Sequence, residues 1–99
     1  MTSKQRAYLK GLAMNIVPVF QIGKSSLTPE ITQAVDEALE ARELIKITVL
    51  KNCLYDCRSI AEVLAERTHS QVVQVIGRKI VLYRPAKDET KRKIVLPEK

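Results

Sequence analysis

Residue types that build catalytic and metal sites are scarce in this chain of 99 residues. It has no tryptophan, one phenylalanine and one histidine, His69. No apolar run approaches the ~20 residues of a membrane-spanning helix, and the N-terminus lacks the continuous apolar stretch of a secretory signal. We therefore expect a cytoplasmic protein that does not span a membrane.

The two cysteines, Cys53 and Cys57, do not match a structural zinc site. Such a site usually has four ligands, with two residues between paired cysteines, whereas three residues intervene here and no second pair exists. Spacing alone leaves a regulatory disulfide open, because it does not fix the geometry. The chain also lacks the Gly-x-x-x-x-Gly-Lys loop that binds nucleotide phosphates. We expect no metal, no other cofactor and no enzymatic activity.

Acidic residues are absent from residues 1–29, which carry a net charge of +4. Residues 30–84 are neutral in sum and residues 85–99 contribute +2, so the net charge of +6 arises at the two ends of the chain. Localised positive charge is typical of a protein that binds a polyanion. It also fits a basic surface that only keeps the protein soluble.

Apolar periodicity predicts a single α/β domain. Ser3, Thr28 and Asp56 are the expected N-caps of three helices, which end near residues 13, 41 and 68. The predicted element order is α-β-α-β-α-β-β, with a four-stranded mixed sheet packed by helices. The strands are expected at residues 19–22, 44–50, 71–76 and 79–84.

The end of the chain is expected to differ from the rest. We predict that the domain covers residues 1–85 and that residues 86–99 form a basic tail. The apolar patch Ile94-Val95-Leu96 in this tail is expected either to dock on the domain or to extend a sheet edge.

The stretch Gly23-Lys24-Ser25-Ser26 joins the first predicted strand to the second predicted helix. Its residues are small or cationic, and a helix start at Thr28-Pro29-Glu30 follows closely. Free backbone N–H groups and the helix dipole favour an anion at such a position. We predict that Gly23, Lys24, Ser25 and Ser26 hold a sugar–phosphate backbone.

Three cations of the first predicted helix, Lys4, Arg6 and Lys10, would extend this surface if the helix packs beside the loop. Arg6 and Lys10 are four residues apart and project together, at a cost of a few tenths of a kcal/mol that an anion would remove. The weaker candidates, each of which could pair with an acid instead, are Arg42, Lys46 and Arg84.

Aromatic residues are too few for a base-stacking sheet. An RNA-recognition-motif sheet carries stacking aromatics on its central strands, and Tyr83 alone does not provide that platform. Phe20 is expected in the core, and the remaining aromatics are Tyr8 and Tyr55. Any RNA contact is therefore expected to rely on phosphates, backbone donors and shape.

Four segments, in this order and spacing, resemble a known family. They are KQRAYLKGLA (residues 4–13), PVFQIGK (18–24), ALEARELIK (38–46) and QVIGRKIVLYR (74–84). They resemble bacterial YhbY-like proteins, which are free-standing members of the CRM (chloroplast RNA splicing and ribosome maturation) domain family.

The resemblance implies a compact α/β RNA-binding domain, similar in fold to the C-terminal domain of translation initiation factor three. It also implies association with the precursor of the large ribosomal subunit. The family has a Gly-x-x-Gly loop after the first strand, and in this chain Ser26 replaces the second glycine. Serine adopts a positive φ less readily than glycine, but its hydroxyl could donate to a phosphate.

We therefore predict a non-enzymatic protein that binds ribosomal RNA and assists assembly of the large ribosomal subunit. The alternative is a protein-interaction module whose basic ends only provide solubility and whose binding surface is either the exposed sheet edge or the Ile94–Leu96 patch. Double-stranded DNA is disfavoured as a ligand because the second predicted helix is acidic and the third is mixed in charge. The oligomeric state and the identity of the RNA stay open.

Overall fold

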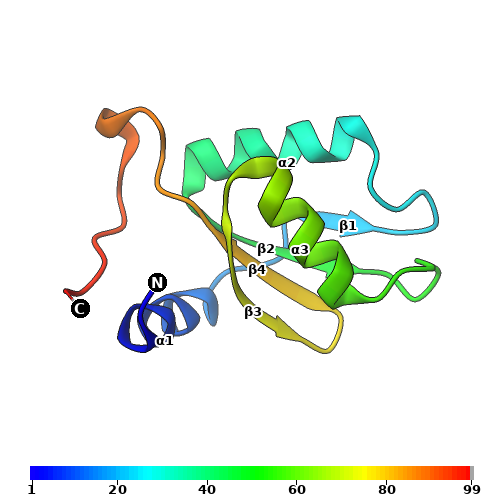
Figure 1. Cartoon of the computed structure of the whole chain (residues 1–99), viewed down its shortest axis with the longest axis horizontal. Helices are drawn as coiled ribbons and strands as arrows, with labels where there is room; N and C mark the ends of the chain where they lie inside the picture. Colours follow the sequence, from blue (N-terminus) through cyan, green and yellow to red (C-terminus); the bar gives the residue numbers. More distant parts are fainter. Residues whose placement is uncertain (99) are drawn as a thin grey trace.

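Three helices and four strands follow one another along residues 1–98, the part of the chain that the computed structural model describes (Figure 1). The predicted order α-β-α-β-α-β-β is confirmed, and a short 3₁₀ helix follows in the tail. None of the described helices is both long and apolar enough to cross a membrane. The elements are α1 (Ser3–Ala13), β1 (Phe20–Ile22), α2 (Pro29–Arg42), β2 (Leu44–Val49), α3 (Cys57–Thr68), β3 (Gln71–Ile76), β4 (Lys79–Tyr83) and η1 (Glu89–Lys91).

Side-chain caps determine where the helices begin. The predicted caps Thr28 and Asp56 are confirmed, but α1 is capped by Thr2 and not by Ser3. The N–H of Gln5 donates to Thr2 Oγ1 at 3.1 Å, and the N–H of Thr2 donates to Gln5 Oε1 at 3.0 Å. Such a capping box needs Glu or Gln three residues after the cap. Thr2 has this partner, whereas the residue three after Ser3 is an arginine.

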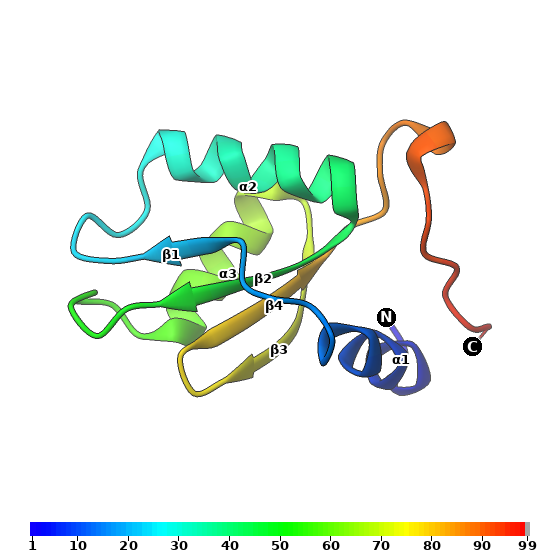
Figure 2. The same cartoon turned by 180° about the vertical axis from the view of Figure 1, so that it is seen from behind.

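The four strands form one mixed sheet in the order β1-β2-β4-β3 (Figure 2). β1 runs parallel to β2, while the β2–β4 and β4–β3 pairs are antiparallel. Gly77 begins the β3–β4 turn with a φ of 55°, and the φ of Arg78 is not positive, which is the pattern of a type II′ hairpin. In the strand order β1-β2-β4-β3, β1 and β3 are the edge strands.

The larger core lies between the sheet and the helices α2 and α3. Ile45, Ile47 and Val49 alternate toward this face of β2, as their spacing predicts, and each is almost fully buried. They share one cluster with Leu39 of α2 and Leu64 of α3. This packing holds the two helices, and the loops before them, at fixed positions relative to the sheet.

The opposite face of the sheet is covered by α1 and by part of the tail. Leu9 of α1 packs in a second cluster with Val73, Val81 and other residues of the sheet. Ile94 and Leu96 pack against the same cluster, so this patch docks on the domain, and no strand is assigned to the described part of the tail. Figures 1 and 2 show α1 and the C-terminal segment at the same end of the sheet.

Glu43, which directly follows α2, ties the tail to the domain. Its buried carboxylate accepts hydrogen bonds from the backbone N–H groups of Ala86, Lys93 and Ile94 at 2.8, 2.6 and 2.9 Å. Burial acts to raise the pKa of Glu43, but these three donations outweigh it and keep the pKa below the ordinary value of 4.5. The carboxylate is therefore charged at neutral pH and satisfies three backbone donors.

Candidate nucleic-acid interface

Gly23, Lys24, Ser25 and Ser26 form a tight turn between β1 and α2, which we call the 23–26 turn. The N–H of Ser26 donates to the carbonyl oxygen of Gly23 at 2.9 Å, which closes the turn. Ser26 has a φ of 54°, in the left-handed region that favours glycine. The serine that departs from the Gly-x-x-Gly pattern thus lies where glycine would fit with less strain.

The beginning of this turn lies against the loop between β2 and α3. A Cβ atom on Gly23 would lie 3.1 Å from Asn52 Oδ1 and 3.3 Å from Leu50 Cδ1, which is tighter than ordinary van der Waals contact. Glycine therefore lets the two loops approach closely without displacing these side chains. This close approach places the start of the 23–26 turn against the loop that follows the carboxyl end of β2.

The 23–26 turn offers hydrogen-bond donors that the fold does not use. Within residues 1–98, the backbone N–H groups of Lys24 and Ser25 have no backbone carbonyl partner, and both residues are exposed. The hydroxyls of Ser25 and Ser26 and the ammonium group of Lys24 belong to the same turn. Consecutive N–H groups beside a cation are an arrangement that binds phosphate oxygens.

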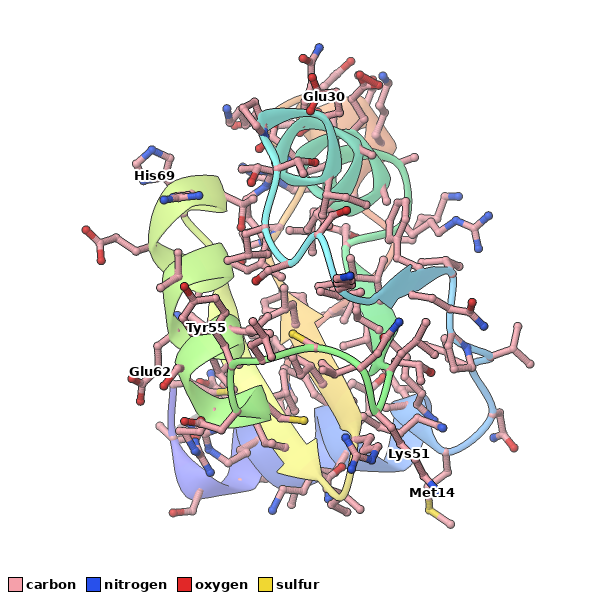
Figure 3. The ribbon with its side chains drawn as sticks, turned by 90° about the vertical axis from the view of Figure 1, so that its right-hand side faces the viewer. Met14, Glu30, Lys51, Tyr55, Glu62 and His69 are labelled. Carbon is pink, nitrogen blue, oxygen red and sulfur yellow. The ribbon has the colours of Figure 1, made fainter. Side chains whose placement is uncertain are left out.

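The N-terminus of α2 adds less to this anion site than the sequence suggests. Pro29 has no N–H group, and the N–H of Ile31 donates to Thr28 Oγ1 at 3.1 Å. The cap thus satisfies a backbone N–H group of the helix end that could otherwise donate to an anion. Glu30 adds a negative charge in the first turn of α2, at the helix end labelled in Figure 3. The capacity to bind an anion therefore rests mainly on the 23–26 turn itself.

A groove with a volume of about 340 Å³ separates the 23–26 turn from α3. Figure 3, which views this end of the molecule, places Tyr55 beside α3. The sequence does not predict a role for Tyr55 or Arg67, because the groove forms only when α3 packs near the turn. The one feature of the sequence that points to this site is the aromatic residue Tyr55 in a predicted loop. The groove is lined by Ser25, Ser26, Leu27, Tyr55, Ser59, Ile60, Val63 and Arg67, and no carboxylate is among them.

The first helix does not pack beside the 23–26 turn, which corrects the prediction of one continuous basic surface. The apolar residues Leu9 and Ala13 place α1 on the sheet face opposite α2 and α3. Figures 1 and 2 show the helix and the turn toward opposite ends of the molecule. Lys4 is exposed on α1, and it is therefore separated from the turn.

Arg6 of α1 contacts the sheet itself. Its Nη1 donates to the carbonyl oxygens of Val72 and Val73 at 2.6 and 2.8 Å. These carbonyls lie where β3 shifts its register against β4, between Val72 and Gln74. Arg6 thus satisfies backbone groups that the irregular edge strand leaves available, and much of its donor capacity is used within the fold.

Two other predicted cations, Lys10 and Lys46, meet in a second groove between α1 and the sheet. This groove has a volume of about 600 Å³, and Lys79 also lines it. Lys79 pairs with Thr48 across the β2–β4 ladder and so lies on the same face as Lys46. The sequence does not indicate Lys79, because its position depends on this pairing.

Arg84 is buried and is not part of the candidate interface. Only 5% of it is exposed, and its guanidinium forms ion pairs with Asp36 and with Glu40, the latter at 3.2 Å. It also donates to the carbonyl oxygen of Thr68 at 3.0 Å. Arg42 is exposed but lies in the last turn of the 14-residue helix α2, about 20 Å from the end that follows the 23–26 turn.

The cysteines and acids do not assemble a metal site in the described structure. Among residues 1–98, no group of three or more His, Cys, Asp or Glu side chains could hold a metal ion. Cys53 and Cys57 are free thiols. Both are half-buried and pack against the larger core, so they help to seat the start of α3.

Two proteins of known name are similar to this chain in sequence over nearly its whole length. The protein named "Probable RNA-binding protein YqeI" from Bacillus subtilis (strain 168) is 43% identical over 97 residues, covering 98% of this chain and 99% of that protein. A protein from Haemophilus influenzae named "RNA-binding protein" is 35% identical, covering 100% of this chain and 97% of that protein.

A solved structure and a family model match as well. The solution structure of the protein SAV1595 from Staphylococcus aureus superposes with a TM-score of 0.78 at 46% identity, covering 98% of this chain and 99% of that chain. The model of the CRS1 / YhbY (CRM) domain matches residues 1–84. The resemblance seen in the sequence is confirmed, and the chain belongs to the CRS1/YhbY (CRM) domain family.

Proposed function

We propose that this chain binds RNA without catalysing a reaction, and that the 23–26 turn holds the sugar–phosphate backbone. The observation that carries the proposal is the turn itself. Within residues 1–98, the exposed residues Lys24 and Ser25 present backbone N–H groups without a backbone partner, an ammonium group and a hydroxyl, and the half-buried Ser26 adds a second hydroxyl. Each of these groups is a donor for phosphate oxygens, which are the usual backbone contacts of nucleic-acid-binding proteins.

The names of the relatives support RNA as the polyanion. Two relatives that cover nearly the whole chain are named as RNA-binding proteins. The net charge of +6 adds a long-range attraction for any nucleic acid. We propose further that the ligand is ribosomal RNA in the precursor of the large ribosomal subunit, and that the protein acts in the cytoplasm. The family resemblance supports this choice of RNA.

The alternative, a protein-interaction module, loses one of its two expected surfaces. The tail patch around Ile94 and Leu96 packs against the second core cluster and is not free to bind a partner in this arrangement. The edge of β3 is also partly covered, since Arg6 donates to the carbonyl oxygens of Val72 and Val73. These contacts favour the RNA-binding proposal.

Replacement of Lys24 tests the role of the turn. In Lys24→Ala, we expect binding of a single-stranded RNA to weaken roughly fivefold, or about 1 kcal/mol. The slope of log K against log salt should become shallower by about 0.7, because one phosphate contact with a single strand is lost. Fluorescence anisotropy at several salt concentrations measures both quantities.

The matched control is Lys87→Ala, which removes an exposed lysine in the tail, beside the C-terminal end of α2, where the N–H of Lys87 donates to Glu40 Oε1 at 2.8 Å. It should leave the affinity and the salt slope close to those of the unmodified chain. If Lys24→Ala and Lys87→Ala behave alike, the turn does not hold the backbone. The ribosomal part of the proposal is tested by co-sedimentation with precursors of the large subunit, which Lys24→Ala should reduce.

A further inference from the structure

We propose that the groove between the 23–26 turn and α3 seats one unpaired RNA base, so that the chain selects single-stranded RNA. This assignment rests on the RNA-binding function proposed above and adds a second type of contact to it. The sequence led us to expect contacts that rely on phosphates, backbone donors and shape, whereas the groove offers a surface for a base.

The walls of the groove have the chemistry of a base site. Leu27, Ile60 and Val63 supply apolar surface, and Tyr55 supplies an aromatic ring. The volume of about 340 Å³ lies at the lower end of the range of about 300–1,000 Å³ that small-molecule sites occupy. Aromatic side chains bind unpaired bases by stacking, and they do so with little dependence on base identity.

Tyr55 is not needed by the hydrophobic core. It is 62% exposed, whereas Tyr83 is 5% exposed and Phe20 packs against the larger core. A large exposed aromatic side chain in a groove keeps apolar surface in contact with water, and a stacked base would remove that surface from water. Tyr55 is thus the aromatic side chain of this groove that is free to stack.

The position of the groove matches the covalent structure of a nucleotide. Ser25 and Ser26 line the groove and also belong to the turn that carries the phosphate donors. A phosphate and a base of one nucleotide are joined through a single ribose, so a phosphate on the turn brings its base to the mouth of the groove. The two contacts therefore form one composite site.

The charges around the groove favour a neutral base inside it over a second phosphate. Asp56, at the start of α3, accepts hydrogen bonds from the N–H and the Oγ of Ser59 at 2.8 and 3.0 Å, which holds its carboxylate beside the groove residue Ser59. A phosphate at that end would be repelled, whereas a base carries no net charge. Arg67, also in the lining, can stack on or donate to a base.

Only an unpaired base can enter such a groove. In an RNA duplex the bases are stacked and paired, and proteins contact the duplex through its shape, its phosphates and its 2′-hydroxyls. Withdrawing a base from a duplex costs a few kcal/mol. The composite site should therefore prefer single strands, loops or bulges to a regular duplex.

The test compares three RNA ligands: a short single-stranded oligomer, the same oligomer with abasic riboses, and a blunt duplex. The unmodified chain should bind the complete oligomer about tenfold more tightly than the abasic one, which is the usual scale of one base–aromatic stack. Tyr55→Ala should remove most of this difference without changing the salt slope, and Tyr55→Phe should retain it. Tyr8→Ala, which removes another exposed tyrosine on α1, is the matched control and should have no effect.

Two results obtained with the RNA ligands would overturn the base site. One is equal affinity of the unmodified chain for the complete and the abasic oligomers, a comparison that needs no variant to fold. The other is binding of the duplex as tight as binding of the single strand. The base site and the phosphate site can be rejected separately. If Tyr55→Ala leaves the affinity difference between the two oligomers unchanged while Lys24→Ala weakens binding as expected, only the base site is rejected. If the unmodified chain binds no RNA, both sites are rejected.

Discussion

At the scale of single residues, the left-handed conformation of Ser26 determines how much strain the 23–26 turn contains. A non-glycine residue at such a φ costs about 1–2 kcal/mol. Ser25, its neighbour, has no positive φ. The two adjacent serines thus differ in conformation while sharing the same side chain and the same loop.

This difference gives a prediction for two glycine variants. Ser25→Gly should lower the free energy of unfolding by about 0.5–1 kcal/mol, because glycine adds entropy to the unfolded chain. Ser26→Gly has the same cost but also relieves the left-handed strain, so its free energy of unfolding should exceed that of Ser25→Gly by about 1–2 kcal/mol. Urea denaturation measures both values; equal stability of the two variants would show that Ser26 is not strained.

Single residues also show which site predictions a sequence supports. Gly23 to Ser26 could be assigned to a loop from local composition, because a strand and a capped helix flank them. The sequence left open whether Arg84 binds RNA or pairs with an acid, and it could not name the partners, because Asp36 and Glu40 lie 48 and 44 positions away in the chain. Tyr55 was overlooked for the same reason, since its groove is completed by residues of the turn and of α3.

At the scale of elements, Glu43 connects the end of α2 to the tail. The carboxylate has no solvent exposure and accepts three backbone hydrogen bonds from Ala86, Lys93 and Ile94. These donors belong to a segment with only one short 3₁₀ helix of its own. Glu40 accepts two further backbone hydrogen bonds, from Lys87 and Asp88 at 2.8 and 3.0 Å, so the position of the tail depends on two carboxylates, of which Glu43 is the buried one.

Replacement of Glu43 by glutamine should destabilise the fold in a pH-dependent way. In Glu43→Gln, an NH₂ group replaces one carboxylate oxygen and cannot accept a hydrogen bond from the backbone N–H groups that face it. The free energy of unfolding should therefore fall by about 2 kcal/mol at neutral pH. The pKa of Glu43 is lowered in the folded state, so its contribution is fully present above about pH 4.5 and is lost as the pH falls through the lower folded-state pKa. The variant should thus approach the unmodified chain in stability under acidic conditions.

Denaturation at neutral and acidic pH measures this convergence. Glu37→Gln alters an exposed glutamate of α2 and serves as the control, with an expected change within about 0.5 kcal/mol at neutral pH. A constant stability gap between Glu43→Gln and the unmodified chain at all pH values would contradict the role of the buried carboxylate.

The elements themselves were largely predictable because their boundaries carry local residues with definite roles. Thr28 followed by proline, Asp56 before α3 and Gly77 in the hairpin all act within a few residues of where they stand. The packing of α1 was not predictable in this way. Its apolar stripe could cover either face of the sheet, and only the complete core determines which one it covers.

At the scale of the whole molecule, two separate surfaces bring basic residues beside a groove. One consists of the 23–26 turn with the groove that contains Tyr55 and Arg67. The other is the groove between α1 and the sheet, where Lys10, Lys46 and Lys79 meet. The net positive charge attracts RNA to the molecule in general, but only the first surface combines unpartnered backbone donors with an aromatic side chain.

The most direct test is to map the RNA contacts on the ¹⁵N-labelled chain by ¹H–¹⁵N chemical-shift changes during titration with single-stranded RNA. The backbone amides of Lys24 and Ser25 should shift most, together with those near Tyr55 at the start of α3. Large shifts around Lys10, Lys46 and Lys79, with the 23–26 turn unchanged, would contradict the account and assign RNA binding to the other groove.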